Sequence, residues 1–284
     1  MALKGASRTK IEVVPLSPAL GAEICGIDAA GPLSDADFQV VLDAWHEHLV
    51  ILLRGQQLDE DQQVTFAQRF GELSPIHTNH HSATNKAVMY IGNRKKDGKM
   101  VGALPLGEMQ FHSDQCYTER PAMGTMLYSI EIPAEGGNTL FANAYKAYEA
   151  LPEEVKRRID GRVAMQVYDY GGGVLDRKHM VKPEEGVSFA HPVARTHPAT
   201  GRKALYVNRL MTHSIEGMPR DESERLLSLM FETIERQDFI YEHRWRVGDL
   251  VLWDNRCSLH ARRDFDPAEN RWLRRVTIQG ERPG

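Results

Sequence analysis

Three residues with metal-binding side chains stand at spacings that could place them around one cation. His112 and Asp114 are two residues apart, and residues i and i+2 of a strand point to the same face. His260 follows the apolar run Leu250–Trp253 and a turn, so we expect it at a strand end or rim. Two imidazoles and one carboxylate on one face leave coordination positions open, which suits non-haem Fe(II) better than a closed zinc site. Taken alone, a His-x-Asp pair is also common in proteins that bind no metal.

Two arginines further along the chain predict a site for an anion. Arg271 and Arg275 lie 11 and 15 residues after His260, four apart on a predicted strand, and therefore share one face. A buried guanidinium without an anionic partner is costly, so a half-buried pair indicates a negatively charged ligand. Considered by itself, the same pair is explained equally well by surface salt bridges.

Taken in order along the chain, these residues resemble the TauD/TfdA family of Fe(II)- and 2-oxoglutarate-dependent dioxygenases. The matching motifs are His112-x-Asp114, Gly136-Gly137-Asn138-Thr139-Leu140-Phe141, Trp253-Asp254-Asn255-Arg256-x3-His260 and Arg271-x3-Arg275. Shorter matches lie at residues 21–26, 70–73 and 191–198, so the resemblance covers nearly the whole chain. Each motif is weak alone, whereas the ordered set is specific.

The resemblance implies a role for each matching residue. His112, Asp114 and His260 match the family's iron ligands. Thr139 and Arg271 match the residues that bind the distal carboxylate of 2-oxoglutarate, a task suited to a guanidinium. The implied cofactors are Fe(II), 2-oxoglutarate as co-substrate, and O2, with 2-oxoglutarate decarboxylated to succinate and CO2. Related halogenating enzymes replace the aspartate with a small residue, so Asp114 implies hydroxylation.

The substrate is expected to be a small anionic organic acid, such as a sulfonate or a phenoxy-carboxylate. Arg275 matches the arginine that faces the acidic group of the substrate in the taurine enzymes. One of His77, His80 and His81 matches their sulfonate-binding histidine, with His77 preferred, and solvated loop histidines are an equal alternative. Glu108 stands where the taurine enzymes carry Asn. This departure favours a larger or aromatic acid of the phenoxyacetate kind over taurine.

Two other classes of function remain open to the same residues. A catalytically silent cupin-like protein would bind a metal or a small acid as a sensor, but the complete set of ligands and arginines disfavours it. A zinc hydrolase using the same triad would leave Thr139 and Arg271 unexplained. Cys116 lies two residues after Asp114. If the strand continues, its thiol shares the ligands' face as a wall of the pocket rather than as a ligand.

The elements that must hold these residues are mostly short strands. Apolar runs bounded by Gly, Pro, Asn and Asp predict strands at residues 50–53, 87–91, 123–132, 162–168, 187–195, 204–207, 239–245, 249–254 and 271–279. Periodicity and capping signals predict helices at residues 34–47, 59–70, 144–150, 152–159 and 221–237.

These strands do not alternate with helices as βαβ units, which favours an antiparallel sandwich or jelly roll decorated with helices. The family's double-stranded β-helix, a cupin-like jelly roll, agrees with this fold class. We expect one domain over residues 1–284, mainly β, with helical insertions and a lid segment around residues 74–110.

Charge and composition exclude several classes of protein. Thirty-five Lys and Arg against 39 Asp and Glu give a net charge of −4, and 42% of the residues are apolar. The composition excludes a mainly disordered chain, the net negative charge disfavours a general nucleic-acid binder, and the three distant cysteines predict no disulfide framework. The absence of an apolar run of 18 residues and of a signal peptide predicts a cytoplasmic protein without a membrane partner. Membership of the family would suggest a homo-oligomer, a dimer or tetramer.

Overall fold

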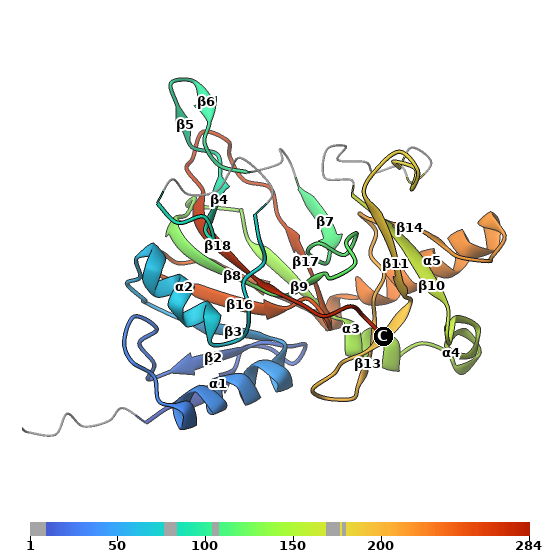
Figure 1. Ribbon diagram of the computed structural model, residues 1–284, viewed down its shortest axis with the longest axis horizontal. Helices are drawn as coiled ribbons and strands as arrows, with labels where there is room; N and C mark the ends of the chain where they lie inside the picture. Colours follow the sequence, from blue (N-terminus) through green and yellow to red (C-terminus); the bar gives the residue numbers. More distant parts are fainter. Residues whose placement is uncertain (1–9, 77–83, 104–107, 169–176, 178–179) are drawn as a thin grey trace, which may run out of the picture.

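Two β-sheets that face each other form the centre of the structure. The computed structural model describes residues 10–76, 84–103, 108–168, 177 and 180–284 (Figure 1). The larger sheet has seven strands, which are neighbours in the order β1 (Glu12–Pro15), β2 (Ala22–Cys25), β3 (Val50–Leu53), β16 (Leu250–Asp254), β8 (Ala122–Glu131), β18 (Trp272–Gln279) and β4 (Met89–Gly92). Neighbouring strands in this sheet are antiparallel, except for the parallel pair β2 and β3.

A four-stranded antiparallel sheet lies against the larger one. Its strands are, in spatial order, β15 (Ile240–His243), β9 (Thr139–Asn143), β17 (Ser258–Arg262) and β7 (Met109–His112). The ring of Phe141 on β9 lies 5.4 Å from that of Trp253 on β16, in an apolar cluster with Leu127 and Leu273. Because this cluster draws residues from both sheets, it fills the space between them. The predicted fold class, mainly β with a jelly roll and inserted helices, is confirmed.

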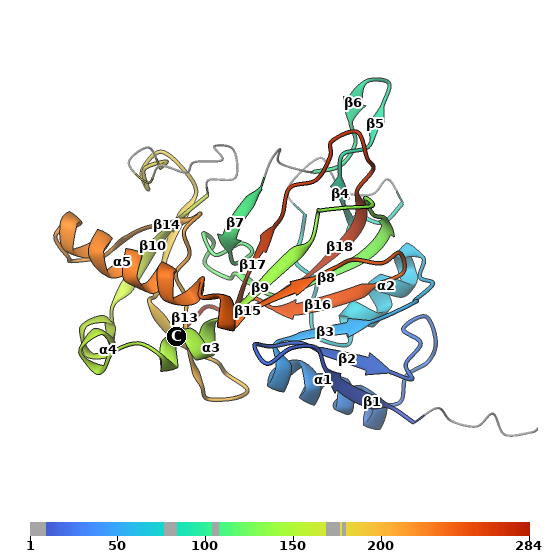
Figure 2. The same cartoon turned by 180° about the vertical axis from the view of Figure 1, so that it is seen from behind.

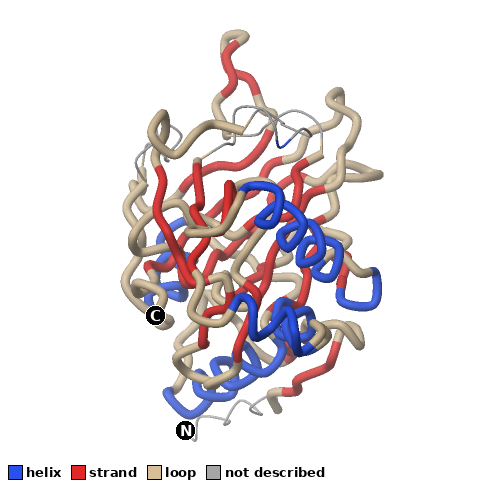
Figure 3. Tube along the Cα trace, turned by 90° about the vertical axis from the view of Figure 1, so that its right-hand side faces the viewer, coloured by secondary structure: helices blue, strands red, loops and turns tan. Residues whose placement is uncertain are grey.

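Helices lie on the outer side of the two sheets and beside them (Figures 1 and 3). They are α1 (Asp35–His48), α2 (Glu60–Gln68), α3 (Ala144–Glu149), α4 (Glu153–Ile159), α5 (Arg220–Ile234) and the 3-10 helix η2 (Gln237–Phe239). The start of α1 is the one predicted, since the hydroxyl of Ser34 accepts a hydrogen bond from the Asp37 N–H at 3.2 Å. The helix ends at His48, and its C-cap residue Leu49 has a φ of 66°.

Successive side chains along a strand point to opposite faces of its sheet and so belong to different hydrophobic cores. On β16, Leu250 and Leu252 join the core beneath α1 and α2, whereas Val251 and Trp253 join the core between the sheets. Leu259 on β17 belongs to a third core with α5. The next residue of β17, His260, consequently faces the space between the sheets.

The remaining strands form smaller sheets beside the sandwich. They are β10 (Val163–Val167), β11 (Ser188–Pro192) and β14 (Thr212–Ile215) in one sheet, β12 (Ala194–Thr196) with β13 (Lys203–Leu205), and β5 (Lys95–Lys96) with β6 (Lys99–Met100). The strand predicted at 187–195 is divided at Val193, where the chain changes partner: its N–H bonds the Arg162 carbonyl beside β10 at 2.9 Å, and its carbonyl accepts the Tyr206 N–H beside β13 at 2.8 Å. The β5–β6 hairpin projects from the body (Figure 2). Among the described residues, no helix combines the length and apolar character needed to cross a bilayer.

Candidate functional site

The structure brings together His112, Asp114 and His260. His112 and His260 are directly opposite each other in the β7–β17 pair, with ring centroids 4.1 Å apart. The Nε2 atoms of His112 and His260 lie 4.0 and 3.8 Å from the Asp114 carboxylate. Each of the three buried residues offers one ligand atom, and these atoms lie within 4.8 Å of one another. The three residues therefore lie together in the folded structure.

The route by which Asp114 reaches this cluster differs from the prediction. β7 ends at His112, so Asp114 lies in a turn rather than on the strand face, and the following Gln115 has a φ of 56°. The turn is held by Ser113, whose hydroxyl donates to the Asn255 carbonyl at 2.9 Å. His112 and Asp114 therefore lie together, but not because they share the face of one strand.

Cys116 also departs from the strand prediction. It packs with Tyr206, Leu210 and Met211, and its Sγ lies 3.4 Å from the Met211 Sδ. Burial raises the pKa of the Cys116 thiol to about 12, so it stays protonated. The thiol therefore belongs to a local core formed with these neighbours rather than to a strand shared with the ligands.

The charge states of the three residues suit a divalent cation. Burial lowers the pKa of His112 and that of His260, which keeps both imidazoles neutral with a lone pair to share. Burial by itself would raise the pKa of Asp114, but Arg275, His260 and His112 hold it well below its usual value. His112 Nδ1 lies 2.9 Å from the Gln110 carbonyl, which assigns the proton to Nδ1 and leaves Nε2 facing Asp114. Two neutral nitrogens and one carboxylate fit a ferrous ion.

Arg275 lies directly beside the cluster. Its Nη2 is 3.0 Å from Asp114 Oδ1, and its Nε donates to the Thr277 hydroxyl at 3.0 Å. The guanidinium therefore sits where an acidic group approaching Asp114 would meet a positive charge.

Arg271 is buried against the segment that leads into Thr139, which is itself buried. Arg271 precedes β18, and its Nε donates to the Gly137 carbonyl at 3.1 Å. Gly137 has a φ of 65°, and a Cβ there would lie 3.1 Å from Arg271 Cδ and Nε, so the glycine of this motif makes room for the guanidinium. The Thr139 hydroxyl accepts a hydrogen bond from Trp245 Nε1 at 3.0 Å, which leaves its proton to be donated elsewhere.

The sequence shows Arg262 among the arginines crowded near the C-terminal end of the chain but gives it no place in the site, and the structure adds its charge near Arg271. Arg262 is buried on β17, directly opposite Thr139 on β9. Burial first, and then the charge of Arg262, lower the pKa of Arg271 to about 9. Alternation from His260 would have placed Arg262 on the same face, but only if β17 had been recognised as a strand. The positive charge around Arg271 favours an anionic ligand.

A second buried group of potential ligands has its hydrogen bonds already satisfied. His197, Asp254 and Cys257 also lie within metal-binding distance of one another. His197 Nδ1 accepts from the Ala199 and Thr200 N–H groups, each at 3.2 Å, so Nε2 carries the proton and donates to Asp254 at 3.0 Å. Arg256 bonds both oxygens of the same carboxylate. The cluster thus ties together two of the matching motifs as a structural network.

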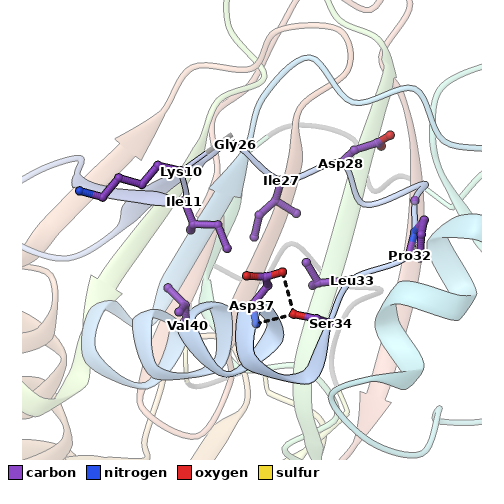
Figure 4. A pocket seen from close by; sticks show the side chains of 11 residues that line it. Lys10, Ile11, Gly26, Ile27, Asp28, Pro32, Leu33, Ser34, Asp37 and Val40 are labelled. Atoms are coloured by element: carbon purple, nitrogen blue, oxygen red, sulfur yellow. Dashed lines mark hydrogen bonds between the residues drawn. The ribbon is translucent and has the colours of Figure 1, made fainter. Parts of the chain in front are cut away.

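A hollow of about 910 Å³ lies elsewhere, against the N-terminus of α1 (Figure 4). Its lining combines the apolar Ile11, Ile27 and Leu33 with Ser34 and Asp37. The last two bond each other in the helix cap, and no histidine lines the hollow. The candidate site is therefore the cluster between the sheets. His77, His80 and His81 lie outside the described residues, as does part of the expected lid segment.

Comparison with known proteins identifies the family of the chain. The model of the family described as taurine catabolism dioxygenase TauD, TfdA family matches residues 12–277. The alpha-ketoglutarate-dependent 2,4-dichlorophenoxyacetate dioxygenase of Burkholderia sp. is 33% identical, covering 94% of this chain and 94% of that protein. The (S)-phenoxypropionate/alpha-ketoglutarate-dioxygenase of Delftia acidovorans is 31% identical, covering 91% of each. The crystal structure of AAD-2 in complex with Mn(II) and N-oxalylglycine superposes with a TM-score of 0.81 at 28% identity, covering 96% of this chain and 99% of that one.

Proposed function

This chain belongs to the TauD/TfdA dioxygenase family, and we propose that it hydroxylates a small organic acid at an iron held by His112, Asp114 and His260. It is a 2-oxoglutarate-dependent non-haem iron dioxygenase, with Fe(II), 2-oxoglutarate and O2 as its cofactor and co-substrates. Fe(II) supplies the activation of O2 that couples hydroxylation to the conversion of 2-oxoglutarate into succinate and CO2. The observation that carries the assignment of ligands is the convergence of two neutral imidazoles and one carboxylate.

We assign the distal carboxylate of 2-oxoglutarate to Arg271 and Thr139. A buried guanidinium whose one hydrogen-bond partner among the described residues is a neutral backbone carbonyl gains most from a carboxylate, which can accept two parallel N–H bonds. The Thr139 hydroxyl, already accepting from Trp245, is oriented to donate. Burial removes competing water, so these interactions are stronger than they would be on the surface.

Arg275 is the proposed partner of the acidic group of the substrate. Its ion pair with Asp114 keeps the guanidinium at the edge of the cluster, from which it can turn to an arriving anion. Tyr117 lies close enough to Arg275 and Asp114 for their charges to influence its pKa, which burial raises. The Tyr117 ring packs edge-on against Tyr168 at 4.9 Å. An arginine beside aromatic surface suits an aryl acid, and the phenoxy-acid relatives support a phenoxy-carboxylate.

Release of succinate from 2-oxoglutarate tests the reaction. With Fe(II) and O2, a panel of phenoxy-carboxylates, sulfonates and sulfate esters should stimulate succinate formation, most strongly with the phenoxy acids. His112→Ala should abolish substrate-stimulated succinate, whereas His213→Ala, at a half-buried histidine on β14, should leave it unchanged. Equal activity of the two variants would contradict the ligand assignment. A homo-oligomeric state, a cytoplasmic location and the lack of a nucleic-acid partner stay predictions from the sequence.

A further inference from the structure

A chain of hydrogen bonds behind Asp114 runs between the two sheets. Trp253 Nε1 donates to Asn255 Oδ1 at 3.0 Å, and Asn255 Nδ2 donates to the Thr125 hydroxyl at 3.0 Å. The Thr125 hydroxyl lies 2.6 Å from Asp114 Oδ2. Thr125 on β8 stands directly opposite Trp253 on β16, and all four residues are buried. The chain therefore links a carboxylate of the candidate metal site to the centre of the larger sheet.

The direction of every bond in this chain is determined by its first member. An indole N–H can only donate, so the atom of Asn255 facing Trp253 must be the amide oxygen. The other atom is then the NH₂ group, which must donate to Thr125. Because the Thr125 hydroxyl accepts this bond, its single proton is directed at Asp114. Asn255 Oδ1 also accepts the backbone N–H of Asp114 at 3.3 Å, which supports the same orientation.

We propose that Thr125 and Asn255 are positioning residues that hold the Asp114 carboxylate in the orientation that the metal requires. The two oxygens of Asp114 have different partners: Thr125 bonds Oδ2, whereas Arg275 bonds Oδ1. Arg275 is partly exposed and is the proposed partner of the substrate. Thr125 is completely buried and cannot turn toward a substrate, so its hydrogen bond to Asp114 is the one that stays in place when substrate binds. The inference rests on the proposed role of Asp114 as a metal ligand.

Substitutions at Thr125 can separate this role from packing. Thr125→Val keeps the shape but removes the hydroxyl, leaving Asn255 without its acceptor and Asp114 without its donor. Thr125→Ser keeps the hydroxyl and removes a methyl group. Thr212 is a matched control, because its hydroxyl is equally buried and also accepts one bond and donates another, to Gln166 at 2.8 Å.

Binding of Mn(II) to the metal-free protein, followed by electron paramagnetic resonance, is the test. We expect Thr125→Val to weaken Mn(II) binding by about 10- to 100-fold, as for other groups that orient metal ligands. Thr125→Ser and Thr212→Val should bind Mn(II) like the wild type, even where thermal unfolding shows the metal-free variants to be less stable. The bound Mn(II) spectrum should change in Thr125→Val alone.

The outcomes distinguish this inference from the proposed function. If wild-type protein binds Mn(II) and Asp114→Ala does not, the metal site stands. Unchanged Mn(II) affinity in Thr125→Val would then overturn the role of Thr125 alone. Equal loss of affinity in Thr125→Val and Thr212→Val would also overturn it, because packing would explain both. Failure of the wild type to bind Mn(II) would instead refute the proposed site.

Discussion

The Arg271 guanidinium should destabilise the protein without its ligand and stabilise the complex with 2-oxoglutarate. The described residues give this side chain one hydrogen bond, from Nε to the Gly137 carbonyl. Burial, and then the charge of Arg262, lower the pKa of Arg271 from 12.5 to about 9. Arginine stays protonated at neutral pH. At about 1.4 kcal/mol per pH unit, the folded protein therefore holds this charge at a cost on the order of 5 kcal/mol.

Arg271→Met removes the charge while keeping much of the volume. The ligand-free variant should consequently have a Tm equal to or above that of the wild type, as when a buried charge is replaced by an apolar side chain. Arg271→Lys keeps a buried charge and should show no such gain. Arg271→Met should also weaken 2-oxoglutarate binding by about 10²- to 10⁴-fold, because two charge-assisted hydrogen bonds of roughly 1.5–3 kcal/mol each are lost.

Thermal unfolding and calorimetric titration check both parts. Mn(II) in place of Fe(II) allows 2-oxoglutarate to bind without turnover, so Tm is measured for the free protein, with Mn(II), and with Mn(II) and 2-oxoglutarate. The wild type should gain stability in the last step and Arg271→Met should not. If the variant were less stable without ligand and bound 2-oxoglutarate with wild-type affinity, the reasoning would be refuted. The guanidinium would then be satisfied by the protein itself.

Two further predictions concern Arg275 and His191. Arg275→Leu should raise the KM for the acid substrate by about 10- to 100-fold, because a charge pair with the substrate is lost, while the calorimetric Kd of 2-oxoglutarate stays unchanged. A rise in both the KM and the Kd would instead place Arg275 in the subsite for 2-oxoglutarate. Burial lowers the pKa of His191 from 6.5 to about 4, so below pH 6.5 the unfolded chain gains a proton that the folded protein does not. Stability contributed by this histidine is therefore complete above pH 6.5 and is lost as the pH falls toward 4, by an amount on the order of 3 kcal/mol. Urea unfolding should show a smaller fall between pH 7 and pH 4.5 in His191→Gln than in the wild type, and identical curves would contradict the assignment.

Spacing along the chain was sufficient to predict which residues meet at the candidate site. His112, Asp114 and His260 were selected by residue type and order, and the structure brings their ligand atoms together. Local signals also predicted α1, because Ser34 and the helical spacing of Phe38, Val41 and Trp45 act within a few residues of one another. The predominance of short strands was likewise enough for the fold class.

The sequence did not reveal the strands that carry Thr139 and His260. β9 and β17 contain Thr139 and His260, yet neither was predicted. Every residue of β9 is buried, so its sequence lacks the alternation of polar and apolar residues that marks a half-exposed strand. The end of β7 at His112, and the turn that carries Asp114, were missed because a strand's length depends on its neighbours.

Residue types and their order along the chain were thus enough to name the side chains that meet at the candidate site, since the chemistry of an imidazole, a carboxylate or a guanidinium belongs to the side chain itself. Only the tertiary structure assigned Thr125 and Asn255 to Asp114, and Gly137 and Arg262 to Arg271. These contacts join residues brought together by strand register and by the packing of one sheet on the other. Burial and the orientation of hydrogen bonds arise from that packing, and no window of the sequence contains it.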